Sequence, residues 1–125
     1  MNKWLSSSVM VAALILSQSA MAESKPTIVL VHGAFAESAS WDGVAAKLLT
    51  DGYPVVAVAN PLRGLKYDAD YVLAVLKSID GPVVLVGHSY GGSVITDVAV
   101  EGTNVKSLVF VSGLAPDTGE SASGL

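Results

Sequence analysis

Residues Val83-Val84-Leu85-Val86-Gly87-His88-Ser89-Tyr90-Gly91-Gly92 decide the fold of this chain. The apolar run over 83–86 predicts a buried β-strand, and the stretch over 93–100 predicts a helix. Between them, Gly87, Ser89 and Gly91 form a G-x-S-x-G motif in strand–turn–helix context. Glycine on both sides of the serine removes the Cβ atoms that would collide in so tight a bend. The pattern therefore predicts a sharp turn that presents the Ser89 hydroxyl above the end of a sheet.

Apolar runs and helical spacings alternate along the rest of the chain. The sequence predicts further strands over 27–31, 55–59 and 105–111 and further helices over 41–49 and 71–79. The strands are apolar throughout, which is typical of strands buried on both faces of a parallel sheet. We therefore expect an α/β fold, with a mostly parallel sheet of about four strands and helices on both faces. An apolar last strand at the edge, followed by a polar tail, would leave that sheet incomplete.

The first 22 residues have the pattern of a secretory signal peptide. Lys3 supplies the positive charge, residues 9–16 supply the apolar core, and Ala20-Met21-Ala22 resembles a cleavage site. The apolar core is shorter than the roughly 20 residues that span a bilayer. We therefore expect export to the periplasm or the outside of the cell, one domain over 23–125, and no stable membrane anchor after cleavage. An uncleaved N-terminal anchor is the alternative.

Composition excludes several classes of function. The formal net charge is −4 and no long basic run occurs, so nucleic-acid binding has no support. The chain has no cysteine, which excludes disulfides, a thiolate nucleophile and a cysteine-based metal site. Asp97, Glu101, Asp117 and Glu120 show no metal-ligand spacing, and no phosphate-binding loop motif is present. We expect neither a metal nor a cofactor, and we interpret Asp117 as a turn residue.

Two segments are expected to meet at the carboxyl ends of the parallel strands, where sites form in such sheets. One contains Ser89, and the other is the His32-Gly33-Ala34-Phe35 loop after the first strand. A serine that attacks a carbonyl group needs fixed N–H donors for the negative charge that develops on the oxygen. The backbone N–H groups of Tyr90 and Ala34 are the candidates for these donors. The alternative for Ser89 is a helix-capping serine.

Neither histidine of the chain has the position expected of a general base. His88 is adjacent to Ser89, and neighbouring side chains at a strand end point to opposite faces. His32 ends a strand that we expect beside the strand of Ser89, but shaping the loop by hydrogen bonds is its favoured role. In this architecture the order along the chain is serine, then an acid, then histidine. No histidine follows Ser89.

The ordered set of motifs resembles the α/β-hydrolase superfamily. The motifs are those around His32-Gly33-Ala34-Phe35 and Ser89, together with Trp41 and Asn60-Pro61-Leu62-Arg63. The chain is most similar to the small esterase branch that includes plant methylesterases and hydroxynitrile lyases, over about residues 25–116. The resemblance implies a cofactor-independent serine hydrolase that cleaves small-molecule carboxylic esters through an acyl-enzyme intermediate. It implies Ser89 as the nucleophile and the N–H groups of Ala34 and Tyr90 as oxyanion-hole donors.

The family places its acid and its histidine after later strands, beyond a helical cap. This chain ends about where that cap would start, so we expect residues 23–125 to be the N-terminal part of such a domain and to be inactive alone. A non-catalytic module that binds a small ligand in the hydrolase pocket remains an alternative. A lyase or haloperoxidase activity on the same motif is another, because a fold alone does not fix a reaction. The sequence does not indicate the oligomeric state.

Overall fold

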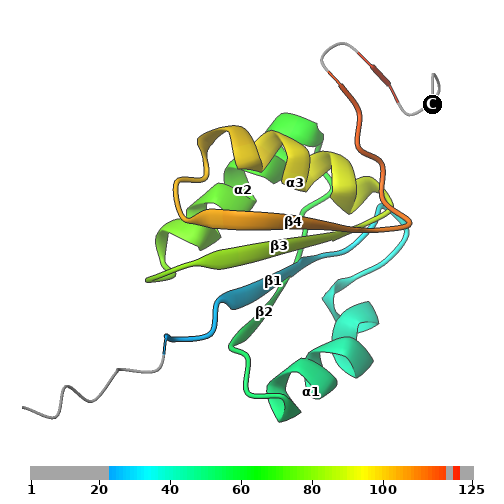
Figure 1. The fold of residues 1–125 in the computed structure, drawn as a ribbon. Coiled ribbons are helices and arrows are strands. Elements are labelled where there is room, and N and C mark those ends of the chain that lie inside the picture. Colours follow the sequence, from blue (N-terminus) through cyan, green and yellow to red (C-terminus); the bar gives the residue numbers. More distant parts are fainter. Residues whose placement is uncertain (1–22, 118–119, 122–125) are drawn as a thin grey trace, which may run out of the picture.

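The computed structural model describes residues 23–117 and 120–121, and the predicted signal peptide lies outside these residues. Eight elements follow one another along the chain (Figure 1). They are β1 (Thr27–Val31), the short 3₁₀ helix η1 (Ser38–Trp41), α1 (Asp42–Thr50), β2 (Val55–Val58), α2 (Leu65–Lys77), β3 (Val83–His88), α3 (Tyr90–Glu101) and β4 (Val105–Val111).

The sheet has four strands in the order β2-β1-β3-β4, and every neighbouring pair is parallel. The predicted parallel sheet is therefore confirmed, and so is the expectation that the strand ending at His32 lies beside the strand ending at Ser89. In register, Val31 at the end of β1 is opposite Gly87 near the end of β3. The loops that follow these two strands consequently leave the sheet side by side.

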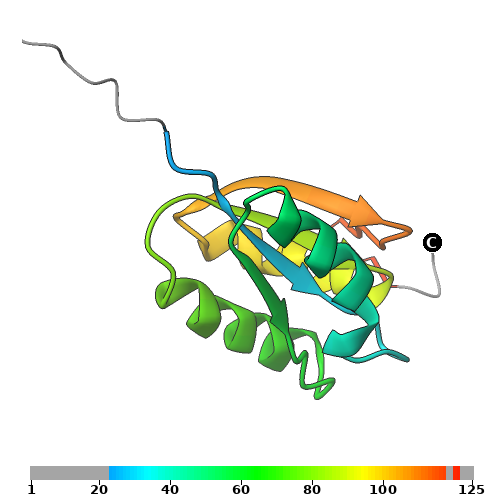
Figure 2. The ribbon, with the colours of Figure 1, turned by 90° about the horizontal axis from the view of Figure 1, so that it is seen from below.

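Helices cover both faces of the sheet, as predicted (Figures 1 and 2). Helices α2 and α3 lie together on one face, and α1 lies on the other. On the α2–α3 face, eleven buried residues form one core cluster: Val29, Val31, Val58, Ala69, Val72, Leu76, Val83, Leu85, Val94, Ile95 and Val98. A smaller cluster under α1 joins Ile28, Leu30, Trp41 and Val86. Alternate side chains of β1 therefore enter opposite cores, which explains why its sequence is apolar at every position.

Helix α2 begins at Leu65, six residues before the helix start predicted from the sequence. Its buried face carries Ala69, Val72 and Leu76, but it also carries Asp68. A carboxylate on the buried face interrupts the apolar stripe from which helices are predicted. The early start of α2 was therefore hidden by a polar side chain in an apolar position.

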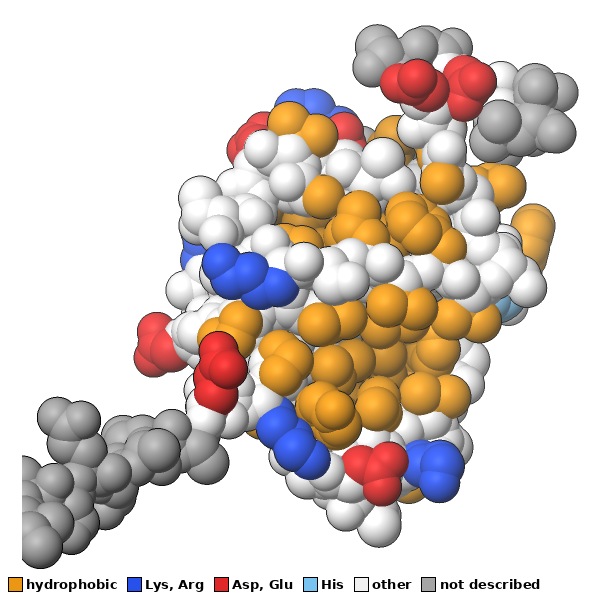
Figure 3. Space-filling model, in the orientation of Figure 1, with side chains coloured by type: hydrophobic (Ala, Val, Ile, Leu, Met, Phe, Trp, Pro, Cys, Tyr) orange, Lys and Arg blue, Asp and Glu red, His pale blue; other side chains and the backbone are white. Residues whose placement is uncertain are grey.

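Strand β4 is at the edge of the sheet, and its side chains are mostly exposed. Val109, Phe110 and Val111 each expose about two fifths of their surface, at 42%, 39% and 42%. Apolar side chains gather over this part of the molecule in Figure 3. The described residues include no strand on the outer side of β4. None of the helices within this described part is long and apolar enough to cross a membrane.

Candidate active site

Ser89 occupies the sharp turn between β3 and α3. Its backbone has φ 52° and ψ −123°, a left-handed conformation that residues other than glycine rarely adopt. Such strain is retained where the surrounding structure fixes it, and it is frequent at functional sites. The Ser89 carbonyl accepts hydrogen bonds from the N–H groups of Gly92, at 2.9 Å, and Leu114, at 3.0 Å. The turn is therefore fixed from the helix and from the loop after β4.

The Ser89 side chain is half-buried and makes no capping hydrogen bond to α3. This geometry does not support the alternative interpretation of Ser89 as a helix-capping serine. The helix packs closely beneath the turn, because a Cβ on Gly91 would overlap the carbonyl oxygen of Val31. Gly91 thus allows the start of α3 to contact the end of β1, which holds the serine turn against the neighbouring strand.

The loop after β1 reaches the serine turn directly. A Cβ on Gly33 would lie 3.0 Å from the Cβ of Ser89, closer than real Cβ atoms normally approach. Only glycine allows the loop to pass at this distance without a shift. Ala34, the next residue, is exposed, and it lines a pocket together with Tyr90. The structure thus brings together the three residues predicted to form the site, although their catalytic roles stay predictions.

His32 is buried, with 3% of its surface exposed, and both of its ring nitrogens have partners. Nδ1 lies 2.8 Å from the carbonyl oxygen of Gly33, and Nε2 accepts a hydrogen bond from the Asn60 N–H at 3.0 Å. A carbonyl can only accept, so this network assigns the proton to Nδ1 of a neutral imidazole. The Asn60 side chain completes the link by donating to the carbonyl oxygen of His32. His32 therefore ties the loop of Ala34 to the end of β2.

His88 lies on the face of the sheet that α1 covers, opposite the α2–α3 face. Its ring meets the buried Trp41 edge to face, with centroids 6.3 Å apart and planes at 88°. The two rings line a hollow of about 210 Å³ with Ala36, Ser40, Val44 and Val111. No hydrogen bond joins the Ser89 hydroxyl to either histidine, both of which lie in the described part of the chain. That neither histidine serves as the base of Ser89 stays a prediction.

A pocket of about 300 Å³ lies beside the serine turn, lined by Ala34, Leu62, Gly64, Leu65 and Tyr90. Its walls come from the loop after β1, the start of α2 and the residue that follows Ser89. Leu62 has φ 57°, a second strained backbone position next to the same pocket. The lining is mostly apolar, which suits a hydrocarbon group of a small ligand.

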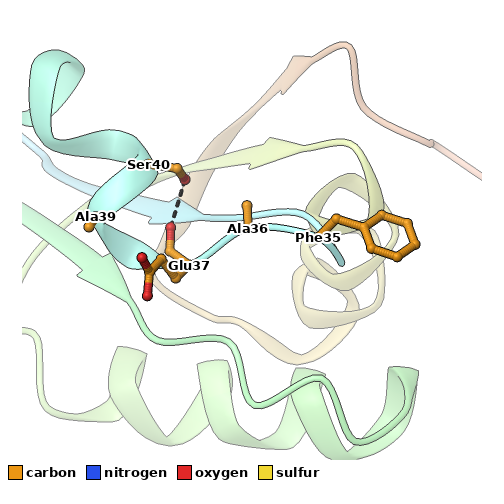
Figure 4. A pocket seen from close by; sticks show the side chains of 5 residues that line it. All are labelled: Phe35, Ala36, Glu37, Ala39 and Ser40. Carbon is orange, nitrogen blue, oxygen red and sulfur yellow. Dashed lines mark hydrogen bonds between the residues drawn. The ribbon is translucent and has the colours of Figure 1, made fainter.

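A larger hollow, of about 630 Å³, lies on the outer side of the 32–41 loop (Figure 4). Phe35, Ala36, Glu37, Ala39 and Ser40 line it. The Phe35 ring points away from the Glu37 and Ser40 side chains, and the Ser40 hydroxyl donates to the Glu37 carbonyl oxygen at 2.6 Å. Neither Ser89 nor Tyr90 lines this hollow, whereas Tyr90 lines the 300 Å³ pocket, so the larger volume alone does not make this hollow the candidate site.

Sequence reasoning missed the contact between Tyr90 and Asp68. The Tyr90 hydroxyl donates a hydrogen bond to Oδ2 of Asp68 at 2.7 Å, across 22 positions in the chain. Burial raises the pKa of Tyr90 above its ordinary value, and the hydrogen bond and charge of Asp68 raise it further. The sequence carried one signal of this contact, an acidic residue in phase with the apolar stripe of α2.

The other acidic residues that the sequence brings into consideration lie on α3 and in the turn after β4. Asp97 and Glu101 are exposed on α3. Asp117 and Glu120 bond to each other in a turn, because the Asp117 N–H donates to the Glu120 carboxylate at 2.7 Å and the Glu120 N–H donates to the Asp117 carbonyl oxygen at 3.0 Å. Within the described residues, no group of three His, Asp or Glu side chains could hold a metal ion.

Comparison with known proteins assigns the fold to a family. Residues 28–124 match the model of the alpha/beta hydrolase family. A probable hydrolase, R7, from Phoma sp. is 32% identical over 113 residues, which are 78% of this chain and 46% of that protein. Methylesterase 3 of Arabidopsis thaliana is 32% identical over 116 residues, which are 81% of this chain and 44% of the relative.

A solved structure supports the same family assignment. An extracellular alpha/beta-hydrolase from a Paenibacillus species superposes with a TM-score of 0.67 at 30% identity, covering 74% of this chain and 42% of the other. The chain thus spans less than half the length of these relatives. The four-stranded parallel sheet, the serine turn after β3 and the family match lead to one conclusion. This chain belongs to the alpha/beta hydrolase family, an enzyme family whose members similar to it include esterases.

Proposed function

We propose that this chain carries the nucleophile and the oxyanion hole of a serine hydrolase that cleaves small carboxylic esters. The observation that carries the proposal is the position of Ser89. Its unbonded hydroxyl stands on a strained turn, and the glycine loop before Ala34 passes against it. The similarity to a methylesterase favours esters as the substrate class.

In the proposed reaction, Ser89 Oγ attacks the ester carbonyl carbon while a general base takes the hydroxyl proton. The N–H groups of Ala34 and Tyr90 stabilise the oxyanion, a contribution worth about 10²–10³ in rate for each such donor. The C–O bond to the alcohol then breaks, and the base returns the proton to the alcohol as it leaves. Attack by water on the acyl-enzyme releases the acid and restores Ser89.

We propose that the base is a histidine outside these 125 residues. His32 is bonded at both nitrogens, and His88 packs on Trp41. Loss of the base from a serine hydrolase removes several orders of magnitude of rate. The 125-residue chain alone should therefore show negligible turnover, and residues 23–125 should be the N-terminal part of a larger hydrolase domain.

The test uses the complete protein encoded by the gene that contains this sequence. We expect a fluorophosphonate probe to label Ser89 and a short-chain p-nitrophenyl ester to be hydrolysed, and Ser89→Ala to abolish both. Ser78→Ala, at the distant end of α2, is the matched control and should retain both activities. Hydrolysis that survives Ser89→Ala would refute the proposal. An unlabelled but folded protein that binds small apolar ligands would favour the binding-module alternative.

We further propose that the protein is exported, with residues 1–22 removed as a signal peptide. The pattern of Lys3, the apolar core and Ala20-Met21-Ala22 supports this. The similar Paenibacillus hydrolase is described as extracellular. N-terminal sequencing of the protein from the culture medium or periplasm should begin at Glu23. Recovery only in the cytoplasm with Met1 intact would contradict it.

A further inference from the structure

Asp68 is a buried carboxylate among apolar neighbours. It is 0% exposed, on the face of α2 that also buries Ala69, Val72 and Leu76. No described lysine or arginine side chain forms an ion pair with it. The ion pair on this helix joins Lys66 to Asp70 instead. Burying a charge without a counter-ion costs free energy, and an apolar side chain of similar size would avoid that cost. Stability alone therefore does not explain an aspartate at this position.

The two oxygens of Asp68 hold two different parts of the candidate site. Oδ2 accepts the hydrogen bond from the Tyr90 hydroxyl at 2.7 Å, and Oδ1 accepts one from the Arg63 backbone N–H at 2.9 Å. The carboxylate is in the first turn of α2, where the positive end of the helix dipole also favours it.

We propose that Asp68 is a positioning residue for ester hydrolysis, which holds Tyr90 and the 62–65 wall of the pocket in fixed relation to Ser89. This inference rests on the proposed function of Ser89 and goes beyond it by assigning a role to a residue that does not touch the substrate.

The hydrogen bond from the Tyr90 hydroxyl to Asp68 restrains the proposed oxyanion donor. Tyr90 follows Ser89 and is the first residue of α3, so its backbone N–H is at the serine turn. Anchoring the far end of its side chain restrains the residue whose N–H is proposed to receive the oxyanion. A tyrosine hydroxyl, whose ordinary pKa is about 10, is protonated at neutral pH, and burial and Asp68 raise the pKa of Tyr90 further. The link is therefore intact under the conditions in which an esterase works.

The hydrogen bond from the Arg63 N–H to Asp68 restrains the pocket wall. Arg63 directly follows Leu62, whose positive φ needs support from its surroundings. The hydrogen bond from the Arg63 N–H fixes this segment to the first turn of α2. Leu62 and Leu65 line the 300 Å³ pocket together with Ala34 and Tyr90. One carboxylate thus sets the distance between an apolar pocket wall and the oxyanion donor.

Three substitutions in the complete protein test the proposal. Tyr90→Phe removes only the hydrogen bond from the Tyr90 hydroxyl to Asp68. Asp68→Leu removes both hydrogen bonds that Asp68 accepts, while filling the space of its side chain. Asp68→Asn is the conservative variant, because its oxygen can accept from Arg63 N–H while its amide donates to the Tyr90 oxygen. Asp70→Asn, on the same helix in the exposed ion pair with Lys66, is the matched control.

We expect Tyr90→Phe to lower kcat by about tenfold or more with little change in KM, since a displaced oxyanion donor acts on the transition state. Asp68→Leu should lower kcat at least as much and also raise KM. Asp68→Asn should recover most of the activity, and Asp70→Asn should behave as the unmodified protein. Rates are counted per Ser89 titrated with fluorophosphonate, so that loss of folded protein does not count as loss of catalysis.

Inhibition by a trifluoromethyl ketone, which forms an oxyanion on Ser89, supplies the second readout. Its Ki should rise in Tyr90→Phe and Asp68→Leu, in parallel with the fall in kcat/KM. Unchanged kcat per titrated site and unchanged Ki in Tyr90→Phe would overturn the inference, even if Asp68→Leu failed to fold. Failure of the proposed function is recognised separately, because hydrolysis would then survive Ser89→Ala.

Discussion

Gly33 approaches Ser89 so closely that a Cβ built on Gly33 would lie 3.0 Å from the Cβ of Ser89. The same Cβ would lie 3.3 Å from the His88 ring and 3.3 Å from the His88 carbonyl oxygen. The loop after β1 and the turn after β3 therefore touch without a side chain between them. This contact sets how near the Ala34 N–H comes to the serine.

Gly33→Ala tests that contact. The added methyl group has to push the loop or the serine turn away by a few tenths of an ångström, because its carbon would lie 3.0 Å from the Cβ of Ser89 and 3.3 Å from the His88 carbonyl oxygen. We expect a loss of about 1–3 kcal/mol in the free energy of unfolding and a fall in kcat/KM that is larger than the stability loss explains. Misplacement by about 1 Å can cost about 10²-fold in rate.

Gly43→Ala is the matched control for Gly33→Ala. Gly43 is on α1, and no atom lies within 4 Å of the Cβ that it would gain. Urea unfolding and ester kinetics of the two variants, measured side by side, check the prediction. Equal activity in the two variants would show that the Gly33 contact does not position the site.

His32→Ala should act on stability and loop position rather than on proton transfer. The substitution leaves the buried Asn60 N–H and the Gly33 carbonyl without their imidazole partner. We expect the free energy of unfolding to fall by about 2 kcal/mol or more. Calorimetry and kinetics per titrated Ser89 separate the two effects. A fall in kcat of several orders of magnitude with unchanged stability would instead identify His32 as the general base.

Tyr90 predicts a dependence of stability on alkaline pH. Its pKa is raised in the folded protein, mainly by burial and then by Asp68, whereas an unfolded tyrosine titrates near about pH 10. Above that pH the unfolded state loses the proton while the folded state keeps it, so unfolding is favoured. The stabilising contribution of Tyr90 is therefore complete below about pH 10 and is lost as the pH rises further.

Urea unfolding of the unmodified protein and of Tyr90→Phe between about pH 8 and 11.5 checks this sign. The amount by which the free energy of unfolding of the unmodified protein exceeds that of the variant should shrink above about pH 10. A difference that stays constant over this range would contradict the prediction.

Gly91→Ala should prevent stable folding. The new Cβ would overlap the carbonyl oxygen of Val31, which is backbone in a central strand and cannot rotate away. Severe overpacking of this kind belongs to the small class of substitutions that cost more than about 4 kcal/mol. Circular dichroism should show loss of cooperative thermal unfolding. A cooperative transition within a few degrees of the unmodified protein would show that α3 can move away from β1.

The sequence predicted the strands well, because apolar β-branched runs bounded by turn residues determine them. The bounds of β1 and β4 agree with the structure to the residue. Their parallel arrangement followed from apolar positions on both faces, and the meeting of the loops after β1 and β3 followed from the expected neighbourhood of those strands. These features depend on local patterns, which a single sequence contains.

The contacts that join distant segments could not be predicted in the same way. Asp68 lies 22 positions from Tyr90, and Asn60 lies 28 positions from His32. Each pair forms only because the register of the sheet and the start of α2 bring the two segments together. Asp68 also hid the first turns of α2, so one buried carboxylate concealed both a helix start and a link to the site.

The strand order has a consequence for motion. β1 and β3 are the two inner strands, each hydrogen-bonded on both sides, while β2 and β4 each have one described neighbour. In this chain the outer strands should exchange their amide hydrogens faster, because local opening begins where fewer hydrogen bonds must break. The loop of Ala34 and the turn of Ser89 both extend from the slowly exchanging pair. The edges can therefore fray while the spacing between the serine and its oxyanion donors persists.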